Sequence, residues 1–222
     1  MEYKTCASIA EKSPRKLLTT LKKALKKSDY AEIRFDFMRP DDVPFALEMT
    51  KNLLGRCVCT LRPKSEGGRF DGSEENRKSI IKLIAEYNPH LIDIEFATLL
   101  KDKDLLRYVR RTNTKILVSW HDFKKTPPLP VLEKKLKAMR TISKFVKIVT
   151  TARSAKDSTV VLSLYKDQSQ GLIAFAMGEQ GRITRILCMH LGSPYTYVSL
   201  GKPVAPGQFS LDEVKSLRLL SP

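Results

Sequence analysis

Lys147 is the residue whose setting most favours chemistry, because it is the one charge in the apolar run Phe-Val-Lys-Ile-Val-Thr at 145–150. Burial among apolar groups disfavours the ammonium form of a lysine, and a neutral amine can attack a ketone to form an imine. A second interpretation stays open, in which the lysine is buried only to pair with Glu95 or Glu32. The run therefore predicts either a Schiff-base nucleophile or a structural ion pair.

His121 is one of three histidines, and it follows the apolar run that precedes the Lys147 segment. An imidazole titrates near neutral pH, which suits it to proton transfer. The pattern alone also allows a capping or packing histidine. His90 and His190 are expected to be structural, because His90 precedes a predicted strand and His190 lies on a short predicted helix.

Further candidate residues gather at or near the ends of the apolar runs. They are Ser8, Glu32, Arg34, Asp36, Arg62, Glu66, Asp93, Glu95, Met177, Arg185 and Gln208. Alternate residues of a strand share a face, so the charges at 32, 34 and 36 are expected on one face. An isolated buried charge is costly, so these groups are expected to pair or to bind a ligand. Arg62, Arg185 and Gln208 are candidate clamps for a small anion, because arginine holds carboxylates in a two-pronged geometry.

The segments that would hold these residues alternate between short apolar runs and longer amphipathic runs. Strands are predicted at Lys4–Ile9, Ala31–Asp36, Cys57–Leu61, Leu91–Glu95, Lys115–Trp120, Phe145–Thr150, Leu172–Ala176 and Tyr195–Ser199. Helices are predicted at about Pro14–Lys27, Val43–Leu54, Glu75–Tyr87, Lys101–Thr112, Val131–Ile142, Ser158–Lys166, Ile183–Leu191 and Leu211–Leu219. Eight such units in 222 residues favour an α/β fold, a (β/α)₈ TIM barrel forming a single domain over residues 1–222. A barrel places its chemistry at the carboxyl ends of its strands.

The chain is strongly basic, with 40 Lys and Arg against 24 Asp and Glu and a net charge of +16. Such a field attracts polyanions, but it also steers small anionic substrates. A nucleic-acid-binding protein needs a clustered basic face with aromatic stacking residues. Here the basic residues are spread along predicted helices and aromatic residues are 8% of the chain, so no nucleic-acid partner is expected.

The four cysteines show no metal-binding or disulfide spacing, and they are Cys6, Cys57, Cys59 and Cys188. Free buried thiols in a reducing cytoplasm are expected. No signal peptide and no apolar run of about 18 residues are recognisable, which predicts a cytoplasmic protein without a membrane partner. No cluster of histidines and carboxylates at ligand spacing is present, so neither a metal nor another cofactor is expected.

The chain resembles the type I 3-dehydroquinate dehydratases of the shikimate pathway from about residue 4 to residue 219. The resemblance is carried by motifs in the expected order, namely Glu-Ile-Arg-Phe-Asp (32–36), Thr-Leu-Arg (60–62) with Glu-Gly-Gly (66–68), Ser-Trp-His-Asp-Phe-Lys-Lys-Thr-Pro (119–127), Val-Lys-Ile (146–148), Met-Gly (177–178) with Ile-Thr-Arg (183–185), and Ala-Pro-Gly-Gln (205–208). It implies a lyase of aromatic amino-acid biosynthesis that removes water from 3-dehydroquinate by syn elimination to give 3-dehydroshikimate, and a homodimer. Tyr197 and Val204 differ from the family pattern, where phenylalanine and serine are usual.

The resemblance also implies a role for each candidate. Lys147 would form the imine with the C3 ketone, His121 would move protons at C2 and at the C1 hydroxyl, and Glu66 would orient His121. The implied binding residues are Glu32 and Arg34 for the ring hydroxyls, Arg62 for the substrate, Arg185 for its carboxylate, Gln208 for a further lid contact, and Ser8 and Met177 for the pocket wall.

Another class I Schiff-base lyase on a TIM barrel, such as an aldolase or a transaldolase, is the alternative. Such enzymes usually bind sugar phosphates in a glycine-rich cradle after strands seven and eight. Gly178, Gly181 and Gly207 would make only a thin cradle, whereas Arg185 suits a carboxylate.

Overall fold

A computed structural model describes residues 3–166, 170–201 and 203–217, and the predicted strands and helices follow one another along them. The chain divides into two compact units, one made of residues 7–117 and the other of residues 1–6 with 118–222. The organisation as a single domain stays a prediction. In the described part of the chain no helix is long and apolar enough to cross a membrane.

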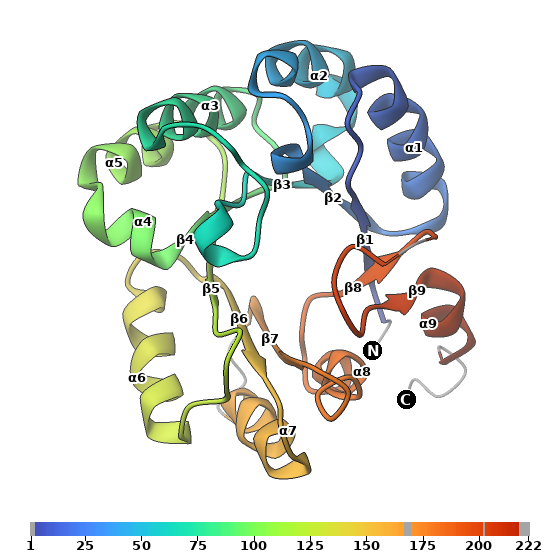
Figure 1. The fold of residues 1–222 in the computed structure, drawn as a ribbon, viewed down its shortest axis with the longest axis vertical. Coiled ribbons are helices and arrows are strands. Elements are labelled where there is room, and N and C mark those ends of the chain that lie inside the picture. The colour runs from blue at the N-terminus through green and yellow to red at the C-terminus, as the bar shows by residue number, and fades with distance from the viewer. Residues whose placement is uncertain (1–2, 167–169, 202, 218–222) are drawn as a thin grey trace. The chain divides into compact units, whose positions relative to one another are not determined.

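The unit of residues 7–117 contains three parallel strands and the helices that follow them (Figure 1). Its elements are the last residues of β1 (Thr5–Ile9), then α1 (Pro14–Lys27), β2 (Tyr30–Arg34), α2 (Val43–Thr50), β3 (Cys57–Thr60), α3 (Glu74–Glu86), β4 (Leu91–Glu95), α4 (Phe96–Lys101) and α5 (Lys103–Arg111). Strand β3 pairs with β2 on one side and with β4 on the other. The register sets Arg34 beside Thr60 and Thr60 beside Asp93, so the polar ends of three strands lie in one row.

The other unit has the same alternation. It contains the end of β5 (Ile116–His121), then α6 (Leu129–Arg140), β6 (Phe145–Thr151), α7 (Ala155–Leu162), β7 (Leu172–Met177), α8 (Thr184–His190), β8 (Thr196–Ser199), β9 (Phe209–Ser210) and α9 (Leu211–Leu217). Strand β6 pairs in parallel with β7, which sets Lys147 beside Ile173 and Thr151 beside Met177.

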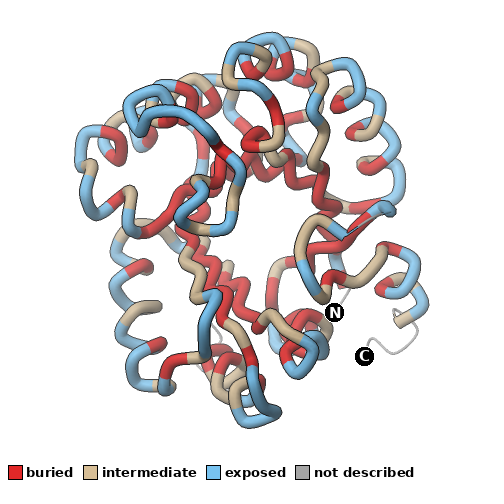
Figure 2. Tube along the Cα trace, in the orientation of Figure 1, coloured by how far each residue is buried: buried red, intermediate tan, exposed pale blue. Residues whose placement is uncertain are grey.

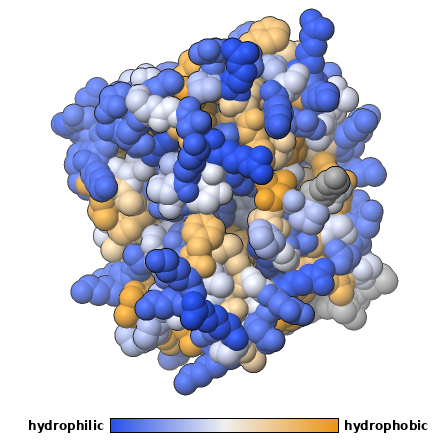
Figure 3. Space-filling model, in the orientation of Figure 1, coloured by the Kyte–Doolittle hydropathy of each residue, from blue (hydrophilic) through white to orange (hydrophobic). Residues whose placement is uncertain are grey.

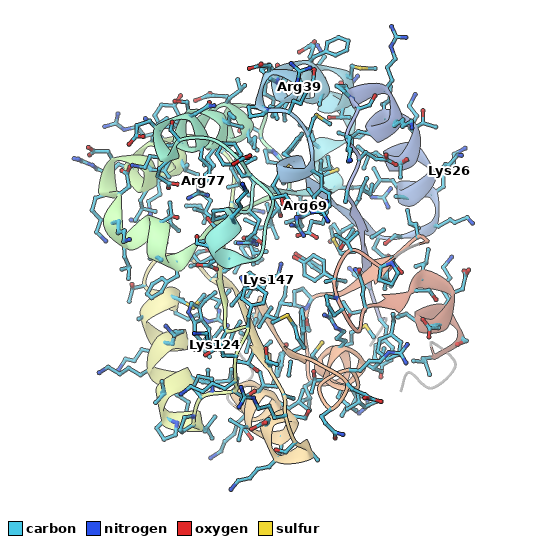
Figure 4. All side chains as sticks on the ribbon, viewed as in Figure 1. Lys26, Arg39, Arg69, Arg77, Lys124 and Lys147 are labelled. Carbon is cyan, nitrogen blue, oxygen red and sulfur yellow. The ribbon has the colours of Figure 1, made fainter. Side chains whose placement is uncertain are left out.

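The burial pattern explains why these segments fold as they do. Every residue of β4 is buried and so are the central five of β6, as expected for parallel strands covered on both faces (Figure 2). On α1 the buried residues are Leu17, Leu21 and Ala24, which recur at helical spacing, while its lysines are exposed. Hydrophilic side chains dominate the face in Figure 3, and Lys26 points away from α1 in Figure 4.

The boundaries differ from the predicted ones at a few places. The helix predicted to run to Leu54 ends at Thr50 and continues as a 3₁₀ segment, Lys51–Arg56. Two short elements, α4 and β9, were not predicted, and the predicted end of the last helix at 218–219 lies outside the described residues. Asp36 was expected to continue strand β2, which is wrong, because the backbone turns into a 3₁₀ segment at Phe35–Phe37.

Candidate active site

Lys147 lies in the middle of β6, with only 6% of its surface exposed. Its Nζ lies 4.3 Å from the centroid of the Tyr197 ring, which comes from β8 (Figure 4). Tyr195, on the same segment, packs edge-on against Tyr197 with ring centroids 5.5 Å apart. The amine is thus held against an aromatic face, where a cation is stabilised by the ring quadrupole.

His121 is the last residue of β5, and the loop that follows it is fastened to β6. Asp122 N–H donates to the Val149 carbonyl at 2.8 Å, and the Thr151 hydroxyl donates to the Asp122 carbonyl at 2.8 Å. The Asp122 carboxylate accepts two backbone N–H groups at the start of the turn, from Lys124 and Lys125. These bonds fix the end of β5 against the strand that carries Lys147, and the Phe123 ring stacks on the imidazole at 5.8 Å.

Arg185 lies on α8 and is 2% exposed. Its guanidinium lies 4.3 Å from the Phe175 ring and donates one hydrogen bond, from Nη2 to the Pro206 carbonyl at 3.2 Å. No carboxylate of the described chain pairs with it, and its buried Nε has no hydrogen-bond partner among the described residues. Burial lowers the pKa of Arg185 to about 10. A desolvated cation in this state is poised for an anionic ligand.

Met177 ends β7, and its carbonyl accepts the Ala152 N–H at 2.9 Å. The next residue, Gly178, has φ of +85°, a conformation that favours glycine. Gln208 is buried, and its side-chain oxygen accepts the Val204 N–H at 3.0 Å, which closes the 204–208 loop on itself.

Glu32 is the acceptor of a small buried network in the other unit. Its two carboxylate oxygens accept hydrogen bonds from the Ser8 hydroxyl and the Thr60 hydroxyl, each at 3.0 Å. Arg34 forms a two-pronged pair with Asp36, with both N–O distances at 2.8 Å. Asp36, although outside the strand, therefore still serves the predicted function of neutralising Arg34.

Arg62 pairs with two carboxylates from β4. Its Nη1 donates to Glu95 and its Nη2 donates to Asp93, both at 2.6 Å, and all three side chains are buried. Burial alone would lower the pKa of Arg62, but the charges of Asp93 and Glu95 outweigh it and raise the pKa above its ordinary value. The predicted neutralisation among these residues is confirmed.

Glu66 lies in a short loop that the backbone closes tightly. The Gly68 N–H donates to the Pro63 carbonyl at 3.0 Å, and Gly67, which follows Glu66, has φ of +74°. A side chain at Gly68 would place its Cβ 2.0 Å from the Arg62 carbonyl oxygen, so only glycine fits there. Burial raises the pKa of Glu66 to about 7, against the opposing effect of Arg62, and Glu95 and Asp93 raise it further.

The two other histidines each contact a tyrosine side chain. His90 stacks on Tyr30 at 4.7 Å, and burial lowers its pKa. His190 Nδ1 lies 2.8 Å from the Tyr3 hydroxyl. All four cysteines are buried and outside any disulfide. Within the described residues no group of three or more His, Cys, Asp and Glu side chains could hold a metal ion.

Sequence reasoning missed three residues that support the candidates. Phe175 packs on Arg185, Asp122 fastens the turn after His121, and Arg77 binds Glu95. Asp122 could have been found, because aspartate often accepts hydrogen bonds from backbone N–H groups at the start of a turn. The role of Arg77 could not have been predicted, because the sequence does not distinguish it from the other charged residues of a polar helix.

The chain is similar to known proteins of one family over almost its whole length. A family model described as Type I 3-dehydroquinase matches residues 5–221. A 3-dehydroquinate dehydratase of Pyrococcus abyssi is 36% identical over 205 residues, which cover 90% of this chain and 93% of that protein. A protein of the same description from Methanocaldococcus jannaschii is 33% identical over 215 residues, which cover 96% of each chain.

Solved structures are similar over almost the whole chain. The crystal structure of 3-dehydroquinate dehydratase from Geobacillus kaustophilus has a TM-score of 0.89 and 25% identity, covering 99% of this chain and 91% of that one. The type I 3-dehydroquinate dehydratase of Clostridium difficile, solved with covalently modified comenic acid, has a TM-score of 0.85 and 25% identity, covering 99% and 92%. These likenesses confirm the predicted α/β fold of (β/α)₈ barrel type. The chain therefore belongs to the type I 3-dehydroquinase family and is a dehydratase that acts on 3-dehydroquinate.

Proposed function

We propose that the dehydration proceeds through an imine between Lys147 and the C3 ketone of 3-dehydroquinate. The observation that carries this proposal is a lysine at the centre of a buried strand, with its Nζ against the Tyr197 ring and 6% of its surface exposed. The aromatic face of Tyr197 stabilises the iminium cation that forms on this nitrogen.

The reaction balances with one base and no external reagent. The Lys147 amine adds to C3, and loss of water gives the protonated imine, which acts as an electron sink. His121 removes a proton from C2 to give the enamine and returns a proton to the C1 hydroxyl, which leaves as water. Hydrolysis of the conjugated iminium frees Lys147 and releases 3-dehydroshikimate.

Arg185 is proposed to grip the substrate carboxylate. Its Nε is buried without a hydrogen-bond partner in the described chain, and a carboxylate oxygen would supply one. Charge-assisted bonds of this kind are among the strongest in proteins. This preference for a carboxylate argues against the sugar-phosphate lyases, which bind a phosphate in a glycine-rich cradle.

The other candidate residues take the roles that the family resemblance implies. We propose that Glu66 orients His121, and that Glu32, Arg34 and Arg62 bind the hydroxyl-bearing part of the substrate. Their carboxylates and guanidinium groups are held by buried hydrogen bonds, which fixes them for binding at little entropic cost. Three residues, Ser8, Met177 and Gln208, are proposed to complete the pocket.

The test is borohydride trapping with 3-dehydroquinate, followed by mass spectrometry of the modified peptide. The adduct is expected on Lys147 and is expected to disappear in Lys147→Ala. Lys144→Ala is the matched control, because Lys144 lies three residues away and is exposed. An adduct of full yield in Lys147→Ala would refute the assignment, and so would turnover of a phosphosugar in place of 3-dehydroquinate.

We further propose that the chain is a cytoplasmic homodimer that needs no cofactor. Light scattering after size-exclusion chromatography would report twice the chain mass of 25.2 kDa. Prolonged dialysis against EDTA is expected to leave the rate unchanged, and a rate restored only by added metal would contradict the proposal.

A further inference from the structure

Arg77 is a buried arginine on α3 that the reaction described above does not use (Figure 4). It is 1% exposed. Its Nε and Nη2 grip the Glu74 carboxylate at 2.9 and 2.8 Å, and Nη2 also donates to the Thr98 hydroxyl at 2.7 Å. Its Nη1 donates to Glu95 at 2.8 Å and to the Leu61 carbonyl at 3.3 Å. Each nitrogen of the guanidinium therefore donates a hydrogen bond to a protein group.

Glu95 links Arg77 to the candidate site. One of its oxygens accepts a hydrogen bond from Arg77, and the other accepts one from Arg62 at 2.6 Å. A carboxylate shared by two guanidinium groups cannot rotate without breaking one of the pairs. The position of Arg62 is thus fixed through Glu95 by a residue on the far side of that carboxylate.

Arg77 also shares a hollow with Glu66. A pocket of about 340 Å³ is lined by both residues and by Glu95, with Glu74, Lys78 and Lys101 among its other charged residues. Lys78 is paired with Asp102 at 2.8 Å in the same pocket. The charges with the largest effect on the pKa of Glu66 are Arg62, Glu95, Asp93 and Arg77, and Glu74, Lys78, Lys101 and Asp102 line the same pocket.

We propose that Arg77 is a positioning residue for the dehydration, which holds Glu95 and through it Arg62, and which balances the charge around Glu66. The proposal rests on the role proposed for Glu66 as the partner of His121. Without Arg77, Arg62 alone would balance Asp93 and Glu95, which leaves an additional negative charge close to Glu66. Arg77 therefore acts at a distance from the reacting atoms. It affects the ionisation of Glu66 and the orientation of Arg62.

A pH dependence follows from the signs of these charges. Burial already raises the pKa of Glu66 to about 7, and Arg77 is among the groups that lower it. Removing the Arg77 charge while Glu95 remains favours the protonated form, so the pKa of Glu66 rises further. A protonated Glu66 is a poorer acceptor for the imidazole N–H, so the acidic limb of the pH–rate profile moves to higher pH.

The experiment compares Arg77→Met and Arg77→Lys with Lys78→Met, which removes a positive charge from the same pocket but not from this network. For Arg77→Met we expect a loss of about 10- to 100-fold in kcat/KM at pH 7, with partial recovery at higher pH. Arg77→Lys is expected to keep the limb near the wild-type position with an intermediate rate, and Lys78→Met is expected to behave as the wild type. A loss that is equal at all pH values would show a merely structural role and overturn the proposal, as would an unchanged rate.

A gentler variant keeps the proposal falsifiable if Arg77→Met does not fold. Glu74→Gln loosens the outer grip on Arg77 and leaves Glu95 untouched, and the Glu74 side chain is 47% exposed. It removes a negative charge from the pocket while Arg77 keeps its positive charge, so the acidic limb is expected to move to lower pH, opposite to Arg77→Met, with at most about a twofold to fivefold loss at pH 7 from the loosened grip. An unshifted limb in a folded Glu74→Gln enzyme would refute the charge-balance argument. Borohydride trapping on Lys147 should persist in all these variants, and its absence in the wild type would instead refute the imine proposal.

Discussion

Replacing Arg185 by methionine should make the protein more stable and much less active. The pKa of Arg185 falls from the ordinary 12.5 to about 10 on burial, which at 1.36 kcal/mol per pH unit corresponds to about 3 kcal/mol. That is the order of the cost of keeping this guanidinium charged without a carboxylate partner. Because burial lowers the pKa of Arg185, the cost of keeping it charged is present at neutral pH and is relieved as the pH rises through about 10.

Part of this gain is lost with the contacts that methionine cannot make. The cation–π contact with Phe175 contributes about 1 kcal/mol, and the hydrogen bond to the Pro206 carbonyl contributes a similar amount. A net stabilisation of about 1 kcal/mol remains, which corresponds to a rise in Tm of roughly 2–4 °C for a chain of this size. The rise is measured by differential scanning calorimetry without ligand.

The activity should change in the opposite direction. Losing two charge-assisted hydrogen bonds to the substrate carboxylate costs about 3–4 kcal/mol, or roughly 10²–10³-fold in kcat/KM. Added 3-dehydroshikimate should raise the Tm of the wild type but hardly that of Arg185→Met. A variant that melts several degrees lower and keeps wild-type kcat/KM would refute both parts of the reasoning, since Arg185 would then be structural.

Three further predictions concern the other candidates. His121→Gln should keep the borohydride adduct and lose about 10²–10⁴-fold in kcat, and unchanged kcat would exclude the imidazole as the acid–base. Tyr197→Leu should reduce trapping of the iminium about 3- to 30-fold while Tyr197→Phe keeps it, because phenylalanine also offers an aromatic face; equal losses would point to the hydroxyl instead. Gly68→Ala should lower the free energy of unfolding by about 2 kcal/mol and impair turnover. Gly55→Ala is the control and should do neither, because an added Cβ at Gly55 meets nothing within 4 Å. A Gly68→Ala variant with unchanged stability would mean that the loop can move.

Much of the fold was predictable because its signals are local. Apolar runs such as 145–150 and helices with a regular buried stripe such as α1 follow from periodicity alone. Asp36 was wrongly assigned to strand β2. The strand ends at Arg34, one residue after its last apolar residue, and the backbone then turns so that Asp36 pairs with Arg34. Helix α4 was missed because it follows β4 directly without a turn, whereas the helix predicted from Lys101 agrees with α5, which begins where Asp102 accepts the Leu105 N–H.

The candidate residues at strand ends were predictable from residue type and order, but their partners were not. Glu95 was expected to pair with Lys147 or with an arginine, and its two oxygens accept hydrogen bonds from Arg62 and from Arg77, a residue that was not among the candidates. Arg77 lies on another element than Glu95, and Phe175 on another than Arg185, so these side chains meet only in the folded chain. Such pairings depend on tertiary packing, which neither spacing nor composition reports.

The double use of Glu95 also restricts how this part of the protein can evolve. Because its carboxylate is shared, a change at position 62 or 77 that removes a positive charge leaves a surplus negative charge in the interior. Divergent sequences should therefore tend to replace an arginine and its carboxylate partner together by a neutral pair. Drift at one position alone would be selected against even where the substrate never touches it.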